Sequence, residues 1–135
     1  MKESPSDICE LLLKRSYESL DEARILAQTS HWNICVNRLY YSCFYAVSAL
    51  LHKYGFSSSK HSGVRSLFNN HFVRTKFVSK VFAAIYNDLF DRRQESDYGI
   101  FFTFEKNDVS PWFNDTEKFI TEISRFIHES PKHPL

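Results

Sequence analysis

The most concentrated group of polar residues in the chain is the run 91–99, Asp-Arg-Arg-Gln-Glu-Ser-Asp-Tyr-Gly. On a helix, Arg93 and Asp97 are four residues apart and lie on one face, where they can form an ion pair. A guanidinium held by a carboxylate can bind a phosphate group, and the neighbouring Tyr98 could stack on a base. The alternative is a charged helix end with Tyr98 packed as a lid, and spacing alone favours this structural interpretation.

A second candidate is a polar and aromatic stripe in the segment 32–54. Its members recur at helical spacing: Arg38, Tyr41, Tyr45 and His52. The stripe could face the Arg93 region or form a dimer contact, although tyrosines that border a buried helix with their hydroxyls in water show the same spacing. A third point is Lys60 with His61, in a polar segment, where a cation could contact a phosphate.

Other common sites lack their motifs. Six histidines are present, but there is no Cys-x-x-Cys and no His-Glu-x-x-His, and His31 with Cys35 supplies only two possible ligands. With only 3 glycines, neither a P-loop nor a dinucleotide fingerprint can be formed. A Ser-His-Asp triad would need spatial evidence, since most chains of this length contain those residue types. We therefore predict no metal and no cofactor.

Composition indicates which elements position these residues. The chain has 135 residues, of which 43% are hydrophobic and 16% aromatic, with only 3 Gly and 4 Pro. So few turn residues disfavour a β-sandwich and favour helices joined by short links. The charges balance, at 17 Lys+Arg against 16 Asp+Glu, which argues against disorder and against a broad basic surface for nucleic acid. We predict one all-α domain, residues 1–135, with its core at about 7–130.

Apolar spacing predicts a bundle of four long helices and one short helix. The first is capped by Asp7 and runs to about residue 29; the second, apolar on most faces and therefore central, spans about 32–54 with Gly55 as its C-cap. A loop at 57–63 precedes the short helix. The fourth helix begins near residue 78 and ends near Arg93 or at Tyr98.

The last helix is expected to begin at Ser110, with Ser110 as its cap and Pro111 at its first position. Residues 100–109 are then irregular, with Phe101 and Phe102 as apolar plugs. No segment approaches the roughly 18 continuous apolar residues of a membrane span, and the N-terminus lacks the apolar centre of a secretion signal. Three cysteines make a disulfide framework improbable. We predict a cytoplasmic protein without membrane contact.

Four ordered motifs, spread over about residues 10–128, resemble those of the HEPN superfamily. The branch is the prokaryotic one whose fourth helix carries Arg, three residues, then Asp-Tyr. The motifs are Asn37-Arg38-x-Tyr40-Tyr41-x-x-Phe44, Lys60-His61-Ser62-Gly63-Val64, Phe68-x-x-x-Phe72-Val73-Arg74 and Arg93-Gln94-x-x-Asp97-Tyr98-Gly99. The resemblance implies a helical bundle, commonly a two-fold dimer, and many members are encoded beside a minimal nucleotidyltransferase in toxin–antitoxin or defence-type pairs.

The resemblance also implies a ribonuclease activity whose sequence motif is only partly present in this chain. Many HEPN members are metal-independent ribonucleases with Arg-x(4–6)-His at the dimer interface, but here the position reached from Arg93 is Tyr98. A tyrosine, with a pKa of about 10, is a poor base near neutral pH. Arg65-x(5)-His71 fits literally, yet six residues on a helix place the two side chains about 120° apart. His61 could supply the imidazole if its loop folds toward Arg93.

The leading hypothesis is therefore a binding protein of the HEPN type rather than an enzyme. Arg93 would contact an RNA or nucleotide phosphate, Asp97 would orient it, and Tyr98 would stack or accept a nucleotidyl group; a nucleotidyltransferase could be the partner at the same surface. Four residues would support this site: Arg38, Tyr41, Lys60 and His61. The alternative is a ribonuclease toxin with a degenerate motif that includes Arg93 and Tyr98. A third reading is a scaffold in which Arg93–Asp97 is only an ion pair.

Overall fold

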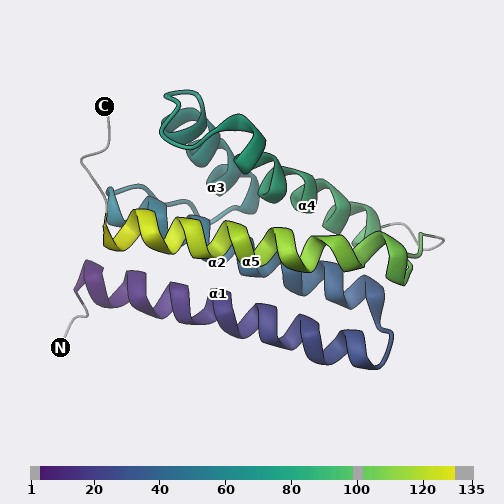
Figure 1. Ribbon diagram of the computed structural model, residues 1–135. Helices are drawn as coiled ribbons and strands as arrows, with labels where there is room; N and C mark the ends of the chain where they lie inside the picture. Colours follow the sequence, from purple (N-terminus) through teal and green to yellow (C-terminus); the bar gives the residue numbers. More distant parts are fainter. Residues whose placement is uncertain (1–3, 99–101, 130–135) are drawn as a thin grey trace.

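The computed structural model describes residues 4–98 and 102–129, and this part of the chain is helical without a β-strand (Figure 1). Its elements are α1 (Pro5–Gln28), α2 (Trp32–Lys53), α3 (His61–Phe68), the π-helix η1 (Asn69–Val73), α4 (Lys80–Tyr98) and α5 (Lys106–His128). The predicted all-α class, with four long helices and one short helix, is confirmed. The π-helical extension of the short helix was not expected.

Helix α2 is the centre of the bundle and contacts α1, α3, α4 and α5. In Figure 1, α5 runs in front of α2, α1 lies beside them in the lower part of the view, and α3 and α4 lie in the upper part. Half of the residues of α2 are buried, from Cys35 to Leu51. By length and composition α2 could also cross a membrane, but 61% of its most apolar stretch is buried inside the bundle. Its apolarity is thus the one expected of a central helix.

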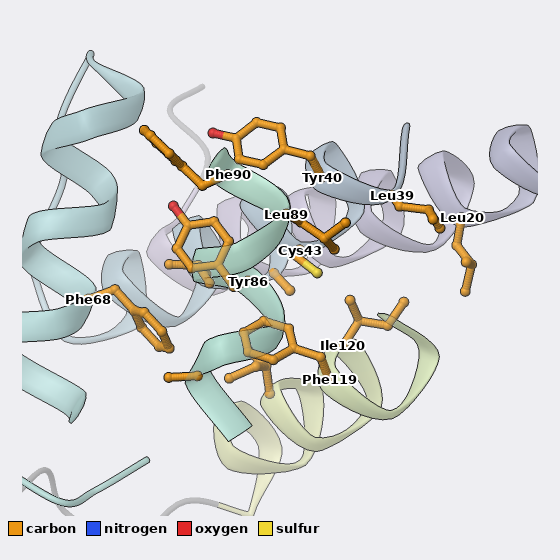
Figure 2. Packing of buried hydrophobic residues seen from close by; sticks show 14 of the residues in the cluster. Leu20, Leu39, Tyr40, Cys43, Phe68, Tyr86, Leu89, Phe90, Phe119 and Ile120 are labelled. Carbon is orange, nitrogen blue, oxygen red and sulfur yellow. The ribbon is translucent and has the colours of Figure 1, made fainter. Parts of the chain in front are cut away.

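The aromatic residues form a continuous core where α2, α3, α4 and α5 meet (Figure 2). Tyr40 of α2 packs edge-on against Phe90 of α4, with their ring centroids 5.8 Å apart. Tyr86 of α4 makes a similar contact with Phe68 of α3 at 5.6 Å, and lies 6.2 Å from Phe119 of α5. Edge-to-face packing of this kind fixes the direction from which α4 approaches α2, and so positions the last turns of α4.

Two caps differ from the predicted ones. Helix α1 is capped by Ser4, which is followed by Pro5, and Asp7 completes a capping box at the third position instead of serving as the cap. At the end of α2 the predicted role of Gly55 is confirmed: Gly55 has φ of 85°, and the N–H groups of Gly55 and Phe56 donate to the carbonyls of His52 and Leu51. This is a Schellman motif, which turns the chain toward α3.

The loop before α3 is shorter than predicted, because His61 and the two residues after it already belong to the helix. Gly63 explains the close fit of this corner: a Cβ atom there would lie 2.0 Å from Oγ of Ser58. The hydroxyl of Ser58 in turn accepts a hydrogen bond from the N–H of Lys60 at 3.2 Å. The loop is therefore packed directly on the first turn of α3, and it sets the position of His61.

The predicted start of the last helix is wrong. Helix α5 begins at Lys106, where Glu105 and Asp108 form a capping box, so Pro111 lies inside the helix. A proline at that depth removes one backbone hydrogen bond, which the capping box and the burial of Val109 offset. Phe104, 5% exposed, fills the core here, whereas Phe102 is 40% exposed and does not act as a plug. Phe101 lies outside the described residues.

Candidate functional site around Arg93 and Tyr40

Helix α4 continues past its tandem arginines to Tyr98, so Arg93 and Asp97 lie one turn apart. Nη1 of Arg93 donates to Oδ2 of Asp97 at 3.0 Å. The side chain of Arg93 is 13% exposed, whereas its neighbour Arg92 lies over the ring of Trp112 in α5, 4.1 Å from the centroid. Only the second arginine therefore faces α2. The side chain of Tyr98 and residue Gly99 lie outside the part of the chain that the structure describes.

Tyr40 lies between the two candidate groups, although the sequence analysis gave it no role in the site. The guanidinium carbon of Arg93 lies 4.6 Å from the centroid of the Tyr40 ring, and the Tyr40 hydroxyl lies 3.0 Å from Nδ1 of His61. The Tyr40 side chain is fully buried, and burial raises its pKa, so the hydroxyl stays protonated. A neutral ring of this kind attracts the guanidinium and hydrogen-bonds the imidazole at the same time.

His61 is held in place by aromatic rings of α2. Its ring stacks on Phe44 with centroids 4.4 Å apart and meets the edge of Tyr41 at 5.4 Å. Burial lowers the pKa of His61, and the positive charge of Arg93 lowers it further. The imidazole is therefore neutral at pH 7. Since Nδ1 faces the Tyr40 hydroxyl, Nε2 is the ring nitrogen that remains for a ligand. The hydroxyl can donate to Nδ1 or accept from it, so this contact fits either neutral tautomer.

Two buried polar atoms beside this cluster have no hydrogen-bond partner among the described residues: Nε of Arg93 and the hydroxyl of Tyr86. Burial raises the pKa of Tyr86, while the charges of Arg65 and Arg93 act in the opposite direction. Unpaired buried groups are rare in folded proteins and call for a ligand or an ordered water.

Arg65 belongs to the surroundings of this site, not to the motif that it spells with His71. Its guanidinium lies over Phe90 of α4, 4.2 Å from the ring centroid, and Nη1 donates to Asp91 at 2.9 Å. His71 lies in η1 and stacks on Phe56, with centroids 4.1 Å apart. The spacing argument anticipated this separation, but it missed the contact of Arg65 with Phe90, whose ring packs against Tyr40.

The predicted stripe on α2 divides between two places. Tyr41 contacts both His61 and Arg38, and the guanidinium of Arg38 lies 4.8 Å from the centroid of the Tyr41 ring. Nη1 of Arg38 also donates to Glu22 of α1 at 3.3 Å. Arg38 therefore flanks the site from the α1 side, and Tyr45 lines a hollow with it. His52 lies farther along α2, in a separate cavity of about 100 Å³. Lys60, the exposed N-cap of α3, adjoins His61.

Among the described residues, the site has neither a cluster of possible metal ligands nor an exposed thiol. No group of three or more possible His, Cys, Asp or Glu ligands converges there. Cys9, Cys35 and Cys43 are buried and free, with exposed fractions of 5, 0 and 0%. Burial raises the pKa of Cys35 to about 11, so this thiol is not a nucleophile near neutral pH.

The sequence model of the HEPN domain matches residues 9–126. The chain belongs to the HEPN family. It is 41% identical to the "UPF0332 protein" of Thermotoga maritima over 122 residues, which are 90% of this chain and 92% of the relative. It is 26% identical over 118 residues to the "Putative toxin MJ0142" of Methanocaldococcus jannaschii, covering 87% of this chain and 80% of that protein. A "UPF0332 protein" of Archaeoglobus fulgidus is 26% identical over 125 residues.

Proposed function

We propose that this HEPN protein binds RNA through its phosphate groups, with Arg93 as the main contact, and that it acts in a toxin-type module. The observation that carries this proposal is the state of the Arg93 guanidinium. It is held from two sides, by Asp97 and by the Tyr40 ring, while 13% of the side chain stays exposed and open to a ligand. A guanidinium fixed in this way is ready to donate to a phosphate oxygen without further ordering.

The groups around Arg93 fit a phosphodiester. His61, next to the same tyrosine, presents Nε2, and Lys60 adds a cation at the start of α3. Because the carboxylates of Asp91 and Asp97 already pair with Arg65 and Arg93, they repel an incoming phosphate less than free carboxylates would. The cluster is small, which agrees with a chain whose charges nearly cancel overall. Tyr98 adjoins this cluster in sequence, and its stacking on a base is part of the proposal.

Replacing Arg93 with Ala tests the proposal, and Arg92→Ala is the matched control. Both variants remove one positive charge from the same turn of α4, but Arg92 lies on Trp112, away from Tyr40. We expect Arg93→Ala to weaken binding of a fluorescein-labelled single-stranded RNA at least about tenfold in an anisotropy titration, because a charge-assisted contact is lost. Arg92→Ala should bind nearly as the wild type does. Equal affinity of Arg93→Ala and wild type would contradict the proposal.

A second function, RNA cleavage without a metal, is favoured by one specific observation: His61 shares Tyr40 with Arg93. With its proton on Nδ1, donated to the Tyr40 oxygen, a neutral His61 can accept the proton of an RNA 2′-hydroxyl at Nε2. The 2′-oxygen then forms a bond to phosphorus, and the bond from phosphorus to the 5′-oxygen breaks. The leaving oxygen takes a proton from water. The products are a 2′,3′-cyclic phosphate and a 5′-hydroxyl end.

Cleavage in EDTA distinguishes the two functions. If His61 is the base, both His61→Asn and Arg93→Ala abolish cleavage, while Tyr98→Phe retains it. If Tyr98 takes that role, its Phe variant is inactive. Wild-type protein that binds RNA but neither cleaves it nor arrests growth on expression has the binding function alone. A homodimer and a nucleotidyltransferase partner are further parts of the proposal, to be tested by size-exclusion chromatography with light scattering and by co-purification.

A further inference from the structure

At the start of α4, far from Arg93, two cavities lie next to each other and share Val78 and Ser79 as lining residues. One, of about 760 Å³, lies between η1 and α4; the other, of about 590 Å³, lies between α4 and α5. Thirteen residues separate Lys80 from Arg93, which is roughly 20 Å along the helix axis at about 1.5 Å per residue. This region is therefore separate from the site proposed above.

The first cavity is basic. Its charged lining residues are Arg74, Lys76 and Lys80, with no carboxylate among them. None of the three forms an ion pair with a described residue, in contrast to the arginines elsewhere in the chain that pair with carboxylates: Arg24, Arg38, Arg65, Arg93 and Arg125. Three like charges around one hollow repel each other and attract an anionic ligand.

The floor of this cavity is polar and rigid. Asn69 and Asn87 exchange two hydrogen bonds through their side-chain amides, at 3.1 and 3.0 Å. Each amide keeps a second N–H and a second lone pair, which are the groups that a peptide backbone uses. Val73 and Val78 form an apolar wall beside them.

The second cavity is mainly apolar. Val78, Phe82 and Phe126 line it. Its two glutamates are already neutralised, since Glu117 pairs with Arg24 and Glu122 pairs with Arg125. An acidic ligand therefore meets little repulsion there.

The aromatic rings of this groove favour a peptide over a nucleic acid. Phe82 stacks face to face on Phe119, with centroids 5.0 Å apart and planes 20° apart. Phe126 packs against Phe77 at 5.4 Å, and the guanidinium of Arg125 lies 5.2 Å from its centroid. Each of the two rings thus has a neighbour against it, which leaves less flat surface for stacked bases, whereas ring edges pack well against aliphatic side chains.

From the charge and shape of these grooves, we infer that the two together are a docking site for a segment of a partner protein in which acidic and aliphatic side chains alternate. Its carboxylates contact Arg74, Lys76 and Lys80, its backbone bonds to the Asn69–Asn87 pair, and its aliphatic groups enter the groove between Phe82 and Phe126. This inference does not depend on RNA binding at Arg93.

The test uses the ¹⁵N-labelled full chain and a synthetic Leu-Glu-Leu-Asp repeat peptide as the probe. We expect the peptide to shift the amide signals of residues 76–82 and 117–122, with little change around Arg93. Lys76→Glu combined with Lys80→Glu should weaken the peptide at least about tenfold, because like charges then face each other. The same variant should gain affinity for a Leu-Lys-Leu-Lys repeat peptide, which excludes misfolding as the cause.

Lys14→Glu is the control for a change of surface charge, since Lys14 is an exposed lysine of α1 outside both cavities. It should leave the affinity for the acidic peptide nearly unchanged. Absence of peptide binding, shifts that map elsewhere, or an equal loss in Lys14→Glu would overturn the inference. It would also be overturned if oligouridine RNA, and not the peptide, shifted the signals of residues 76–82. Loss of RNA binding in Arg93→Ala with peptide binding intact separates this site from the first.

Discussion

The two ends of α4 hold their cations in opposite ways. At its C-terminal end, Arg93 is 13% exposed and is fixed by Asp97 and the Tyr40 ring. Near its N-terminal end, Lys76 and Lys80 are exposed and form no ion pair with a described residue. A buried, oriented charge selects a ligand by geometry, whereas exposed charges attract many anions and are screened by salt. The two ends of α4 can therefore bind different ligands: Arg93 favours a ligand of defined geometry, and Lys76 with Lys80 can accept many anionic groups.

The largest expected effect on stability comes from removing the Tyr40 ring, on which the Arg93 guanidinium packs. Tyr40→Ala deletes a fully buried ring and should lower the free energy of unfolding by about 3–5 kcal/mol. Lys76→Gln, near the N-terminal end of α4, should change the free energy of unfolding by less than about 0.5 kcal/mol, because this side chain is exposed. Urea denaturation followed by circular dichroism measures both. Similar losses of stability in Tyr40→Ala and Lys76→Gln would contradict the difference between the two ends of α4.

A smaller effect is expected at Gly63, which sets the position of His61. Gly63→Ala places a Cβ atom against Ser58 and should cost about 1–3 kcal/mol through overpacking. The double variant Gly63→Ala, Ser58→Gly removes the obstacle and should recover most of the stability. RNA affinity should fall and recover in parallel, while binding of the acidic peptide near Lys80 stays constant. If Gly63→Ala were as stable as the wild type, the loop around Ser58 would have moved to accommodate the added Cβ atom without a cost in stability.

Two hydroxyl groups of the core give a matched pair of still smaller effects. Tyr40→Phe removes the bond to His61 and should lower the free energy of unfolding by about 1 kcal/mol. Tyr86→Phe removes a buried hydroxyl without a described partner, and should leave stability unchanged or raise it slightly. Thermal unfolding of the two variants compares them directly. A marked loss in Tyr86→Phe would reveal a partner, such as a bound water, for that hydroxyl.

The smallest expected effect is a dependence on pH near His61. Its pKa is lower in the folded chain than the ordinary value of 6.5, so the unfolded chain binds more protons in mildly acidic solution. The stability that comes from the neutral imidazole is complete above about pH 6.5 and is lost as the pH falls below that value. Arg93 faces the ring and opposes its protonation. His61→Asn should therefore lose less stability than wild type between pH 7.5 and 5.5 in urea denaturation.

Hydrophobic spacing predicted the helices well because their cores are regular. The apolar faces of the segment 32–54 correctly indicated a central helix, and the i, i+4 spacing of Arg93 and Asp97 anticipated their ion pair. The start of α5 was missed, since Ser110-Pro111 has the residues of a helix start and no local signal shows that Glu105 with Asp108 caps the helix earlier. The packing of Phe104 and Val109, which local sequence preference does not show, accompanies the earlier start of α5.

The candidate site was predictable only where its residues share one helix. The contact between His61 and Tyr40 joins positions 21 residues apart, and it depends on how the loop packs against Gly63. The Asn37–Phe44 motif contained Tyr40, but its buried ring resembled an ordinary core residue in the sequence. The basic cavity near Lys80 was also missed, because balanced overall charge conceals a local excess.

The buried thiols have a practical consequence for measuring these sites. Cys9, Cys35 and Cys43 lie inside the bundle, so maleimide reagents reach them only when the chain opens. A cysteine introduced on the surface would react first, and a fluorophore or spin label could be attached there without replacing the native cysteines. Labels near residue 62 and residue 118 would then report separately on the two ends of α4.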